Sequence, residues 1–512
     1  IYYSKTSGKF QTSISDSPDE LAVATAKYTK SLEKTGWDFL TVSSYEKTSD
    51  KYSDDIKVYG MGYLEGVLSK DRIYPFYQNL LHSIFYKNHN EMTKNVKTYL
   101  NKNLEYMKTN ALNKKNESEY WEQIYLTYRQ MEGVVDGYNS VCEKNKKLSF
   151  FEFQLIFSNT DIEDIVYYND TTTRPNFKKM SVEEIIEYSI LHNHCSSLIK
   201  VTNDLSDIFF GHNTWTNYGQ LIRVFKEYRF VPNKKNLKSN TVAFPSYPGV
   251  LSSVDDFYYL DSKLVVMETT NSVYDDTLYD LLNPNTILTW IRAFIANRLA
   301  YDGKSWTEIF KHENSVTYNN QFQILDLNKI NLNSQNISDG AFYIIEQIPG
   351  YTESRDMTNI LRKGYFPSYN IPFLPNVYEK AGFIKIIEEK PEMYDSADYS
   401  GSDRPKIFRR DHSKVQDVES YKKLLRYNDY KNDEYSRGNS AWALASRYDL
   451  NDGTVGKSYC YGAIDVKFVS IKELMEGKNI IHIISGPTND QQPTFSWSNA
   501  TCQEINPDRW HH

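Results

Sequence analysis

The sequence of 512 residues contains no apolar run that approaches the roughly 18 residues needed to cross a bilayer. It also lacks any dense block of basic residues, and 59 Lys and Arg stand against 66 Asp and Glu, for a formal net charge of -7. A protein that neutralises the nucleic-acid backbone needs clustered positive charge. We therefore expect neither a membrane-spanning helix nor a nucleic-acid partner.

Cysteine is scarce as well, with Cys142, Cys195, Cys460 and Cys502 the four in the chain. No Cys-x-x-Cys pair and no Cys/His ligand spacing occurs, which argues against a structural zinc site. If Cys195 is a reactive thiol, an odd number remains. Cys460 and Cys502 both lie in the C-terminal region, so we predict that they form a disulfide and leave Cys142 single, while other pairings stay open.

Two motifs of well-known protein classes are absent from the sequence. No Gly-x-Ser-x-Gly elbow occurs, which disfavours an α/β-hydrolase lipase. The glycines at 60, 62 and 66 lack the spacing of a dinucleotide-binding loop. We interpret them as sites of close helix packing.

The chain also lacks an initiating methionine and a charged-then-apolar leader. This pattern is expected of a secreted or lumenal protein after signal removal, although a trimmed chain looks the same. Four Asn-x-Ser/Thr tripeptides are candidate glycosylation sites, at Asn116, Asn169, Asn336 and Asn499. Such tripeptides also arise by chance, so they support a secretory route only weakly.

Aromatic residues, in contrast, are abundant at 15% of the chain, with 42 tyrosines. They favour an ordered, half-buried, β-rich architecture. Residues 1–168 are predicted to be mostly helical, and residues 169–194 to form an exposed polar linker with a short helix at 180–191. From residue 195 onward, strand pairs followed by helix pairs indicate a layered α+β domain, with one helix expected at 218–228.

A candidate nucleophile stands where the linker ends. Cys195 heads an alternating, strand-like run, and His212 and Trp215 follow 17 and 20 residues later, where a second strand could return them to its side. The functional hypothesis is that the thiol attacks the carbonyl of His194, cuts the chain there and makes Cys195 a new N-terminus. Its freed α-amine would then serve as the base for thiolate attack on a substrate carbonyl. The structural alternative is a buried, inert thiol.

Other residues of the chain are also candidates for a site. His192, His194 and Cys195 do not face one side of an extended segment, so a shared metal fits poorly. A Cys195–His212 dyad of the cysteine-protease kind remains open. Asp255 and Asp256 are candidate acid/base groups, but a role in capping a turn is the more common one for aspartate.

The two runs His194-Cys195-Ser196-Ser197-Leu198-Ile199-Lys200 and Phe209-Phe210-Gly211-His212-Asn213-Thr214-Trp215 closely resemble the phospholipase B-like family of N-terminal nucleophile hydrolases. Ten further blocks continue the resemblance in the family's order, at 246–249, 255–258, 268–270, 317–321, 346–350, 368–372, 404–411, 426–429, 464–467 and 485–488. Residues 1–168 resemble the family more loosely. The tail at 506–512 resembles the start of the family's closing motif and then stops.

The resemblance implies an αββα sandwich made as a proenzyme and cut between His194 and Cys195. Residues 1–168 and 195–512 would then be two chains that remain associated as one folded unit. Cys195 would be the nucleophile, and the remaining pocket residues would be His212, Trp215, Thr270, Asn370 and Arg404. Asn370 is the preferred oxyanion donor, whereas Arg404 lies beyond an irregular segment.

The function expected from this resemblance is release of fatty acyl chains from phospholipids, without a metal or organic cofactor. The partners would be an acyl-lipid substrate and, transiently, a membrane surface, in a secreted or lysosomal or endosomal location. Two alternatives stay open: an amidase on N-acyl amides, and a lipid-binding scaffold with little turnover.

Overall fold

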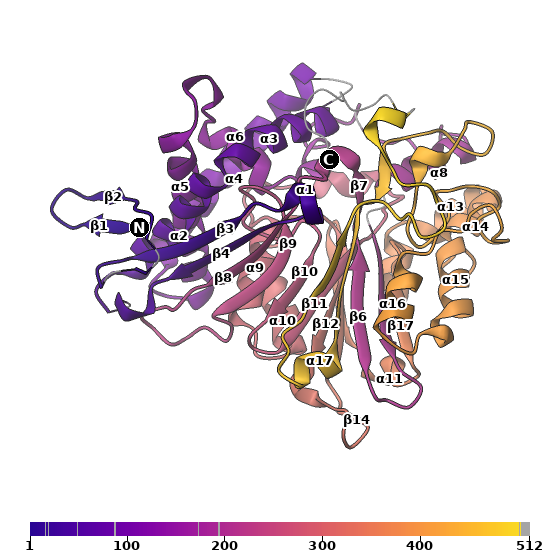
Figure 1. Cartoon of the computed structure of the whole chain (residues 1–512). Coiled ribbons are helices and arrows are strands. Elements are labelled where there is room, and N and C mark those ends of the chain that lie inside the picture. The colour runs from indigo at the N-terminus through magenta and orange to yellow at the C-terminus, as the bar shows by residue number, and fades with distance from the viewer. Residues whose placement is uncertain are drawn as a thin grey trace.

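The computed structural model describes residues 1–512 except 16, 19, 49, 86–88, 173, 193, 194, 501 and 503–512. Its centre is a nine-stranded sheet in the order β16-β15-β12-β11-β10-β9-β8-β4-β3 (Figure 1). Neighbouring strands run antiparallel except β4 and β8, which are parallel. In chain order the strands are β3 Ala24–Thr29, β4 Asp38–Ser44, β8 Val224–Arg229, β9 Thr241–Ser246, β10 Phe257–Leu260, β11 Leu264–Thr270, β12 Asn320–Asp326, β15 Phe342–Ile348 and β16 Tyr351–Asp356.

A five-stranded antiparallel sheet lies against one face of the first, in the order β17-β5-β6-β19-β20. Its strands are β5 Ser196–Val201, β6 Ile208–Asn213, β17 Tyr365–Ser368, β19 Asp465–Ser470 and β20 His482–Ser485. Phe210 of β6 meets Phe257 of β10 at 6.1 Å between ring centroids, and Gln323 Nε2 of β12 donates to Ser197 Oγ of β5 at 2.8 Å. The two sheets therefore share a packed interface.

Helices cover the outer face of the nine-stranded sheet, where Val266 of β11 joins one hydrophobic cluster with them. They are α2 Asp54–Leu68, α3 Lys70–Phe85, α4 His89–Lys114, α5 Glu119–Val141, α6 Phe150–Phe157, α7 Ile162–Ile165, α9 Thr289–Leu299 and α10 Gly303–Phe310. Met267, the next residue of β11, belongs instead to the cluster between the sheets. This alternation shows that β11 is covered on both faces, as a central strand must be.

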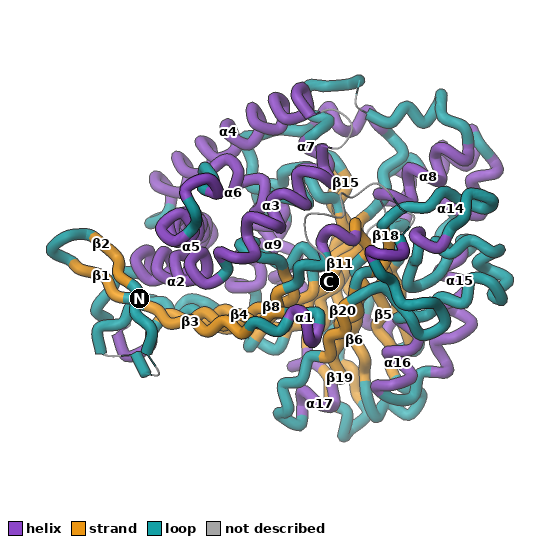
Figure 2. The backbone as a smooth tube through the Cα atoms, turned by 45° about the horizontal axis from the view of Figure 1, so that its top comes forward, coloured by secondary structure: helices purple, strands orange, loops and turns teal. Residues whose placement is uncertain are grey.

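A second set of helices shares the inter-sheet cluster from the side of the five-stranded sheet (Figure 2). They are α8 Val182–His192, α11 Thr358–Leu361, α12 Pro375–Lys380, α13 Phe383–Glu389, α14 Tyr394–Ala397, α15 Asp403–Asp411, α16 Val418–Leu425 and α17 Ile471–Met475. The layered α+β architecture predicted from the sequence is confirmed.

Helices α2 and α5 cross at unusually close range. A Cβ atom added at Gly62 or Gly66 would overlap the backbone of α5, and one added at Gly133 or Gly137 would overlap the backbone of α2. The interpretation as sites of close helix packing is confirmed for Gly62 and Gly66, whereas a Cβ atom at Gly60 would meet the side chains of Val23 and Ile1 and no helix.

The prediction of a helix at 218–228 is wrong. Residues 218–220 form a short 3-10 turn, and β8 follows at Val224–Arg229, where Val224, Lys226 and Tyr228 are buried and the intervening residues are more exposed. Apolar residues at 221, 222, 225 and 228 fit a helical face, but pairing with β4 and β9 on either side makes this segment a strand.

The structure also locates the predicted disulfide and the candidate glycosylation sites. Cys460 and Cys502 form the predicted disulfide, with Cα atoms 5.3 Å apart, and Cys142 and Cys195 are free thiols. Among the candidate glycosylation sites Asn116, Asn169 and Asn336 are exposed, whereas the side chain of Asn499 lies outside the described part. No helix of the described residues is long and apolar enough to span a membrane.

Candidate active site

Cys195 lies immediately before β5, at the end of the five-stranded sheet, and is 1% exposed. The neighbouring strand β6 runs back antiparallel and places His212 opposite Ser197 and Asn213 opposite Ser196. A short strand, β7 Trp215–Asn217, follows and pairs with β18 Tyr461–Ala463. The hairpin thus returns residues 212–215 to the vicinity of the thiol.

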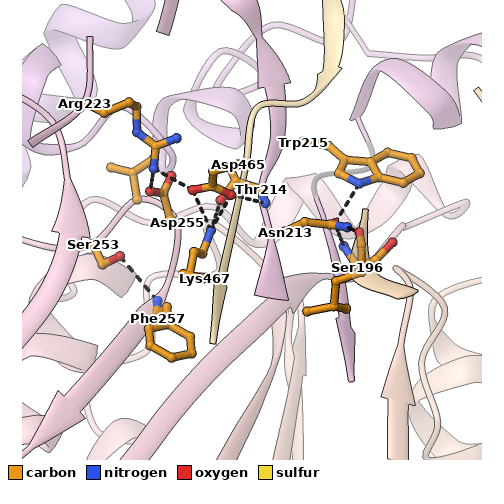
Figure 3. A network of polar contacts seen from close by, with 12 residues as sticks. Ser196, Asn213, Thr214, Trp215, Arg223, Ser253, Asp255, Phe257, Asp465 and Lys467 are labelled. Atoms are coloured by element: carbon orange, nitrogen blue, oxygen red, sulfur yellow. Dashed lines mark hydrogen bonds and ion pairs between the residues drawn. The ribbon is translucent and has the colours of Figure 1, made fainter. Parts of the chain in front are cut away.

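The side chain of Asn213, for which the sequence predicted no role, holds the end of this hairpin in place (Figure 3). Its Oδ1 accepts hydrogen bonds from the backbone N–H of Ser196 at 3.0 Å and from Nε1 of Trp215 at 2.9 Å. Its Nδ2 donates to the carbonyl oxygens of Leu425 and Leu444, both at 2.8 Å. Asn213 therefore fixes the first residue after the thiol and the indole beside it.

Arg404, on α15, reaches the same point from the helical layer. Nη1 donates to the carbonyl oxygen of Cys195 at 2.7 Å, and Nη2 donates to the carbonyl oxygen of Tyr369 at 2.6 Å and to Oδ1 of Asn370 at 2.8 Å. The guanidinium also lies 4.5 Å from the ring centroid of Trp215. Burial lowers the pKa of Arg404, which Asp403 beside it raises. A single side chain therefore connects Cys195, Trp215 and Asn370.

The side-chain amide of Asn370 uses one of its two hydrogens in a hydrogen bond within the protein. Its backbone is left-handed, with a φ of 71°, a conformation that asparagine tolerates better than most residues. Nδ2 donates to the carbonyl oxygen of Thr270 at 2.7 Å. Since the amide has two hydrogens, one remains for an oxyanion. The Thr270 hydroxyl is buried and has no hydrogen-bond partner among the described residues.

On the other side of the thiol lies a group that sequence reasoning missed. Cys195 Sγ, a ring nitrogen of His212 and a carboxylate oxygen of Glu268 all lie within 4.8 Å of one another. The hydroxyl of Tyr318 donates to Glu268 Oε1 at 2.8 Å. Glu268 stood in one of the family-like blocks, but nothing local to it indicated a neighbouring thiol.

Burial determines the protonation of this group. It raises the pKa of the Cys195 thiol well above its ordinary value, and the nearby Glu268 carboxylate adds to the effect while Lys467 opposes it. Burial lowers the pKa of His212 well below its ordinary value, so the imidazole is neutral. Burial likewise raises the pKa of Glu268 well above its ordinary range and that of Asp256 to about 7. The thiol is therefore protonated at rest and needs a base.

A buried ion-pair network lies beside the Asn213 group (Figure 3). Arg223 pairs with Asp255 and Asp465, and Lys467 Nζ lies 2.9 Å from Asp465 Oδ1. Burial alone would raise the pKa of Asp465, but Lys467 and Arg223 overcome it and hold the value at about 2. Asp465 Oδ1 also accepts the backbone N–H of Thr214 at 2.9 Å. Asp255 thus belongs to a buried ion pair, and burial raises the pKa of its neighbour Asp256.

Three adjoining pockets surround these residues. Cys195, Trp215 and Tyr318 line one of about 370 Å³. A second, of about 760 Å³, shares Trp215 and extends to Arg404, and a third, of about 560 Å³, shares Tyr318 and includes Thr270.

Two of the six predicted pocket residues lie behind these walls. His212 and Asn370 are fully buried and line none of the three pockets. His194, the other half of the predicted cleavage site, lies outside the described residues.

Known proteins resemble this chain over most of its length. The family model for phospholipase B matches residues 24–512. Phospholipase B-like protein B of Dictyostelium discoideum is 37% identical over 516 residues, covering 99% of this chain and 86% of the relative. Phospholipase B-like 1 of Bos taurus is 36% identical over 94% of this chain and 86% of the relative, and the Homo sapiens protein of that name is 34% identical over 94% and 84%. On this similarity the chain belongs to the phospholipase B family.

Proposed function

We propose that this chain is an acyl hydrolase that cuts itself between His194 and Cys195 and then uses the Cys195 thiol to release fatty acyl chains from glycerophospholipids. The observation that carries the proposal is the position of Cys195. It lies at the head of β5 and lines a pocket, its carbonyl is held by Arg404, and Arg404 also holds Asn370. Family membership supplies the acyl-lipid substrate class.

The first step is self-cleavage. The thiol adds to the His194 carbonyl, the bond to the Cys195 nitrogen breaks as that nitrogen takes up the thiol proton, and a thioester forms. Water opens the thioester and leaves a carboxylate on His194 and a free α-amine on Cys195. The φ of 151° at Cys195 supports this step, because backbone strain of this kind gathers at reactive positions.

Turnover uses the amine that the first step released. An ordinary α-amine has a pKa of roughly 7.7–8.0, so it can take the proton from a thiol that burial keeps neutral. The thiolate attacks the ester carbonyl, and the free Nδ2 hydrogen of Asn370 receives the developing oxyanion. The lysolipid alcohol leaves with the proton, and water hydrolyses the acyl thioester to fatty acid and thiol.

The large sheet supports the proposal that the two chains remain associated after cleavage. Strands β3 and β4 precede the cleavage site, yet β4 pairs along its length with β8, which follows it. A buried ion pair between Glu65 and Lys226 adds a second link between the same two parts. Removing residues 1–168 would expose this interface, so we infer that both chains stay in one folded unit.

The disulfide and the exposed Asn116, Asn169 and Asn336 suit an oxidising compartment, so we propose a secreted or lysosomal or endosomal lumenal location. The substrate would reach the pockets from a membrane surface by transient contact.

The test compares the wild type with Cys195→Ala and with Cys142→Ser, which removes the other free thiol. Wild type and Cys142→Ser should yield two fragments, the second beginning at Cys195, and should release fatty acid from phosphatidylcholine micelles. Cys195→Ala should remain one chain and release none. Acyl release by Cys195→Ala at the wild-type rate would refute the mechanism. Release from N-acyl amides alone would identify an amidase, and cleavage without release from either substrate would identify a scaffold.

A further inference from the structure

The cluster of Cys195, His212 and Glu268 offers one sulfur, one nitrogen and one oxygen ligand within 4.8 Å of one another. The three residues come from the start of β5, from β6 and from β11, so both sheets contribute. All three side chains are buried, with 1% exposure for Cys195 and none for the other two. This set is distinct from the exposed acidic groups that are common on protein surfaces.

The cluster contains polar atoms whose hydrogen-bonding capacity is unused. Neither ring nitrogen of His212 has a hydrogen-bond partner of ordinary geometry among the described residues. The carboxyl of Glu268, in contrast, also contacts the buried carboxyl of Asp256. Buried polar atoms are normally paired, and an exception calls for an explanation such as an ion. A fully buried imidazole with neither nitrogen in a hydrogen bond of ordinary geometry, beside a thiol, is such an exception.

The donor set matches one class of cation. Thiolate, imidazole and carboxylate are the ligands that zinc takes in proteins, with three protein groups and an open fourth position in reactive sites. The nearby cations Arg223 and Lys467 are paired with Asp255 and Asp465, which offsets part of their repulsion of a bound cation. When the ion binds, Cys195 and Glu268 release their protons to solvent and supply the two negative charges that neutralise a divalent ion.

We propose that Cys195, His212 and Glu268 bind one zinc ion, or a cation of the same class such as cadmium, and that the bound ion reversibly blocks the nucleophile. The ion enters through the pocket of about 370 Å³ that Cys195 lines. It is an inhibitor of the thiol and not a cofactor. These ligands form no motif of short spacing, because successive members lie 17 and 56 positions apart in the chain.

Cleavage adds a fourth ligand, and this part of the inference rests on the proposed function. The α-nitrogen and the sulfur of one cysteine are joined through two carbons, so together they close a five-membered chelate ring on a cation. In the uncut chain that nitrogen is an amide and a poor ligand. The cut protein should therefore bind zinc at least 10-fold more tightly than the uncut one.

The binding test uses Co²⁺, which reports a thiolate ligand by a charge-transfer band in the near ultraviolet. Metal-free wild-type protein should bind one Co²⁺ with this band, and one equivalent of Zn²⁺ should abolish it. The band should be absent in Cys195→Ser. Glu268→Gln and His212→Ala should bind Co²⁺ with an affinity at least 10-fold lower than that of the wild type. Cys142→Ser and His412→Ala, which remove a thiol and a half-buried imidazole outside the cluster, should behave as wild type.

Absence of a charge-transfer band in the wild type, or its persistence in Cys195→Ser, would overturn the proposal. Glu268→Gln keeps the shape of the side chain, so it remains informative if His212→Ala fails to fold. A second readout is acyl release, which Zn²⁺ should suppress in the wild type and a chelator should restore. If the protein releases no acyl chains, the cobalt band still tests the metal site, so failure of the two proposals can be told apart.

Discussion

Arg404 donates a 2.7 Å hydrogen bond to the carbonyl oxygen of Cys195 while its other terminal nitrogen holds Oδ1 of Asn370 at 2.8 Å. The proposed nucleophile and the proposed oxyanion donor belong to different segments, and this guanidinium is the link between them. Its planar, forked donors fit two acceptors at once, which a lysine ammonium cannot reproduce. Arg404 is thus a positioning residue for both halves of the reaction.

Replacing Arg404 with lysine should therefore lower kcat for acyl release by about 100-fold, the scale of losing one oxyanion donor, with a smaller change in KM. Arg355→Lys is the matched control, since Arg355 is half exposed and pairs with Glu353, far from the thiol in the sequence. Steady-state kinetics on micellar phosphatidylcholine would measure both. A wild-type kcat in Arg404→Lys would show that Asn370 needs no such support.

Asn213 supports the site in a different way, because all four of its hydrogen bonds are buried. Asn213→Ala would leave donors and acceptors on Ser196, Trp215, Leu425 and Leu444 unpaired, at about 1–3 kcal/mol each when buried. We expect a loss of at least about 3 kcal/mol and a clearly lower midpoint of chemical unfolding. Asn331→Ala, which removes one exposed bond to Ser334, should shift the midpoint little. Equal shifts of the midpoint in the two variants would show that the buried hydrogen bonds of Asn213 do not stabilise the fold.

The hairpin formed by β5 and β6 shows how much of the site could be predicted from the sequence. Because β5 and β6 are adjacent in the chain, the return of His212 and Trp215 to Cys195 followed from local pattern alone. Glu268 lies on β11 of the other sheet, and its contact with the thiol depends on how two sheets pack. No periodicity encodes that packing. The same holds for β8, whose apolar spacing suited a helix until its pairing with β4 and β9 was known.

The crossing of α2 and α5 gives a prediction about stability. In Gly137→Ala the new methyl group would overlap the carbonyl oxygen of Tyr63, so the helices must separate. Overpacking of this kind typically costs about 1–3 kcal/mol and here opposes backbone rather than a flexible side chain. Gly60→Ala on α2 is the control, because its Cβ would meet the nearest atom, Val23 Cγ1, at 3.2 Å. Thermal unfolding should give a lower Tm for Gly137→Ala, and a Tm no lower than that of Gly60→Ala would refute the close contact.

The acid pair beside the thiol makes stability depend on pH. Asp256 is buried against Glu268 and Tyr318, with Asp255 and Asp161 adding negative charge, and its pKa rises from 3.8 to about 7. Below pH 3.8 the carboxyl is protonated in both folded and unfolded chains and contributes no difference. Between pH 3.8 and 7 the unfolded chain releases this proton while the folded chain keeps it, so stability falls as pH rises, and the penalty is constant above pH 7.

Asp256→Asn removes this titration, and asparagine suits the φ of 37° at this position. Relative to wild type, the variant should therefore gain stability between pH 4 and pH 8, by up to about 4 kcal/mol at 1.36 kcal/mol per pKa unit. Unfolding midpoints of both proteins at pH 4 and pH 8 would measure the gain. Asp339→Asn, which alters an exposed carboxylate paired with Arg362, should show the same difference from wild type at both values. An Asp256→Asn difference that does not change with pH would mean that the folded protein does not hold this proton on Asp256.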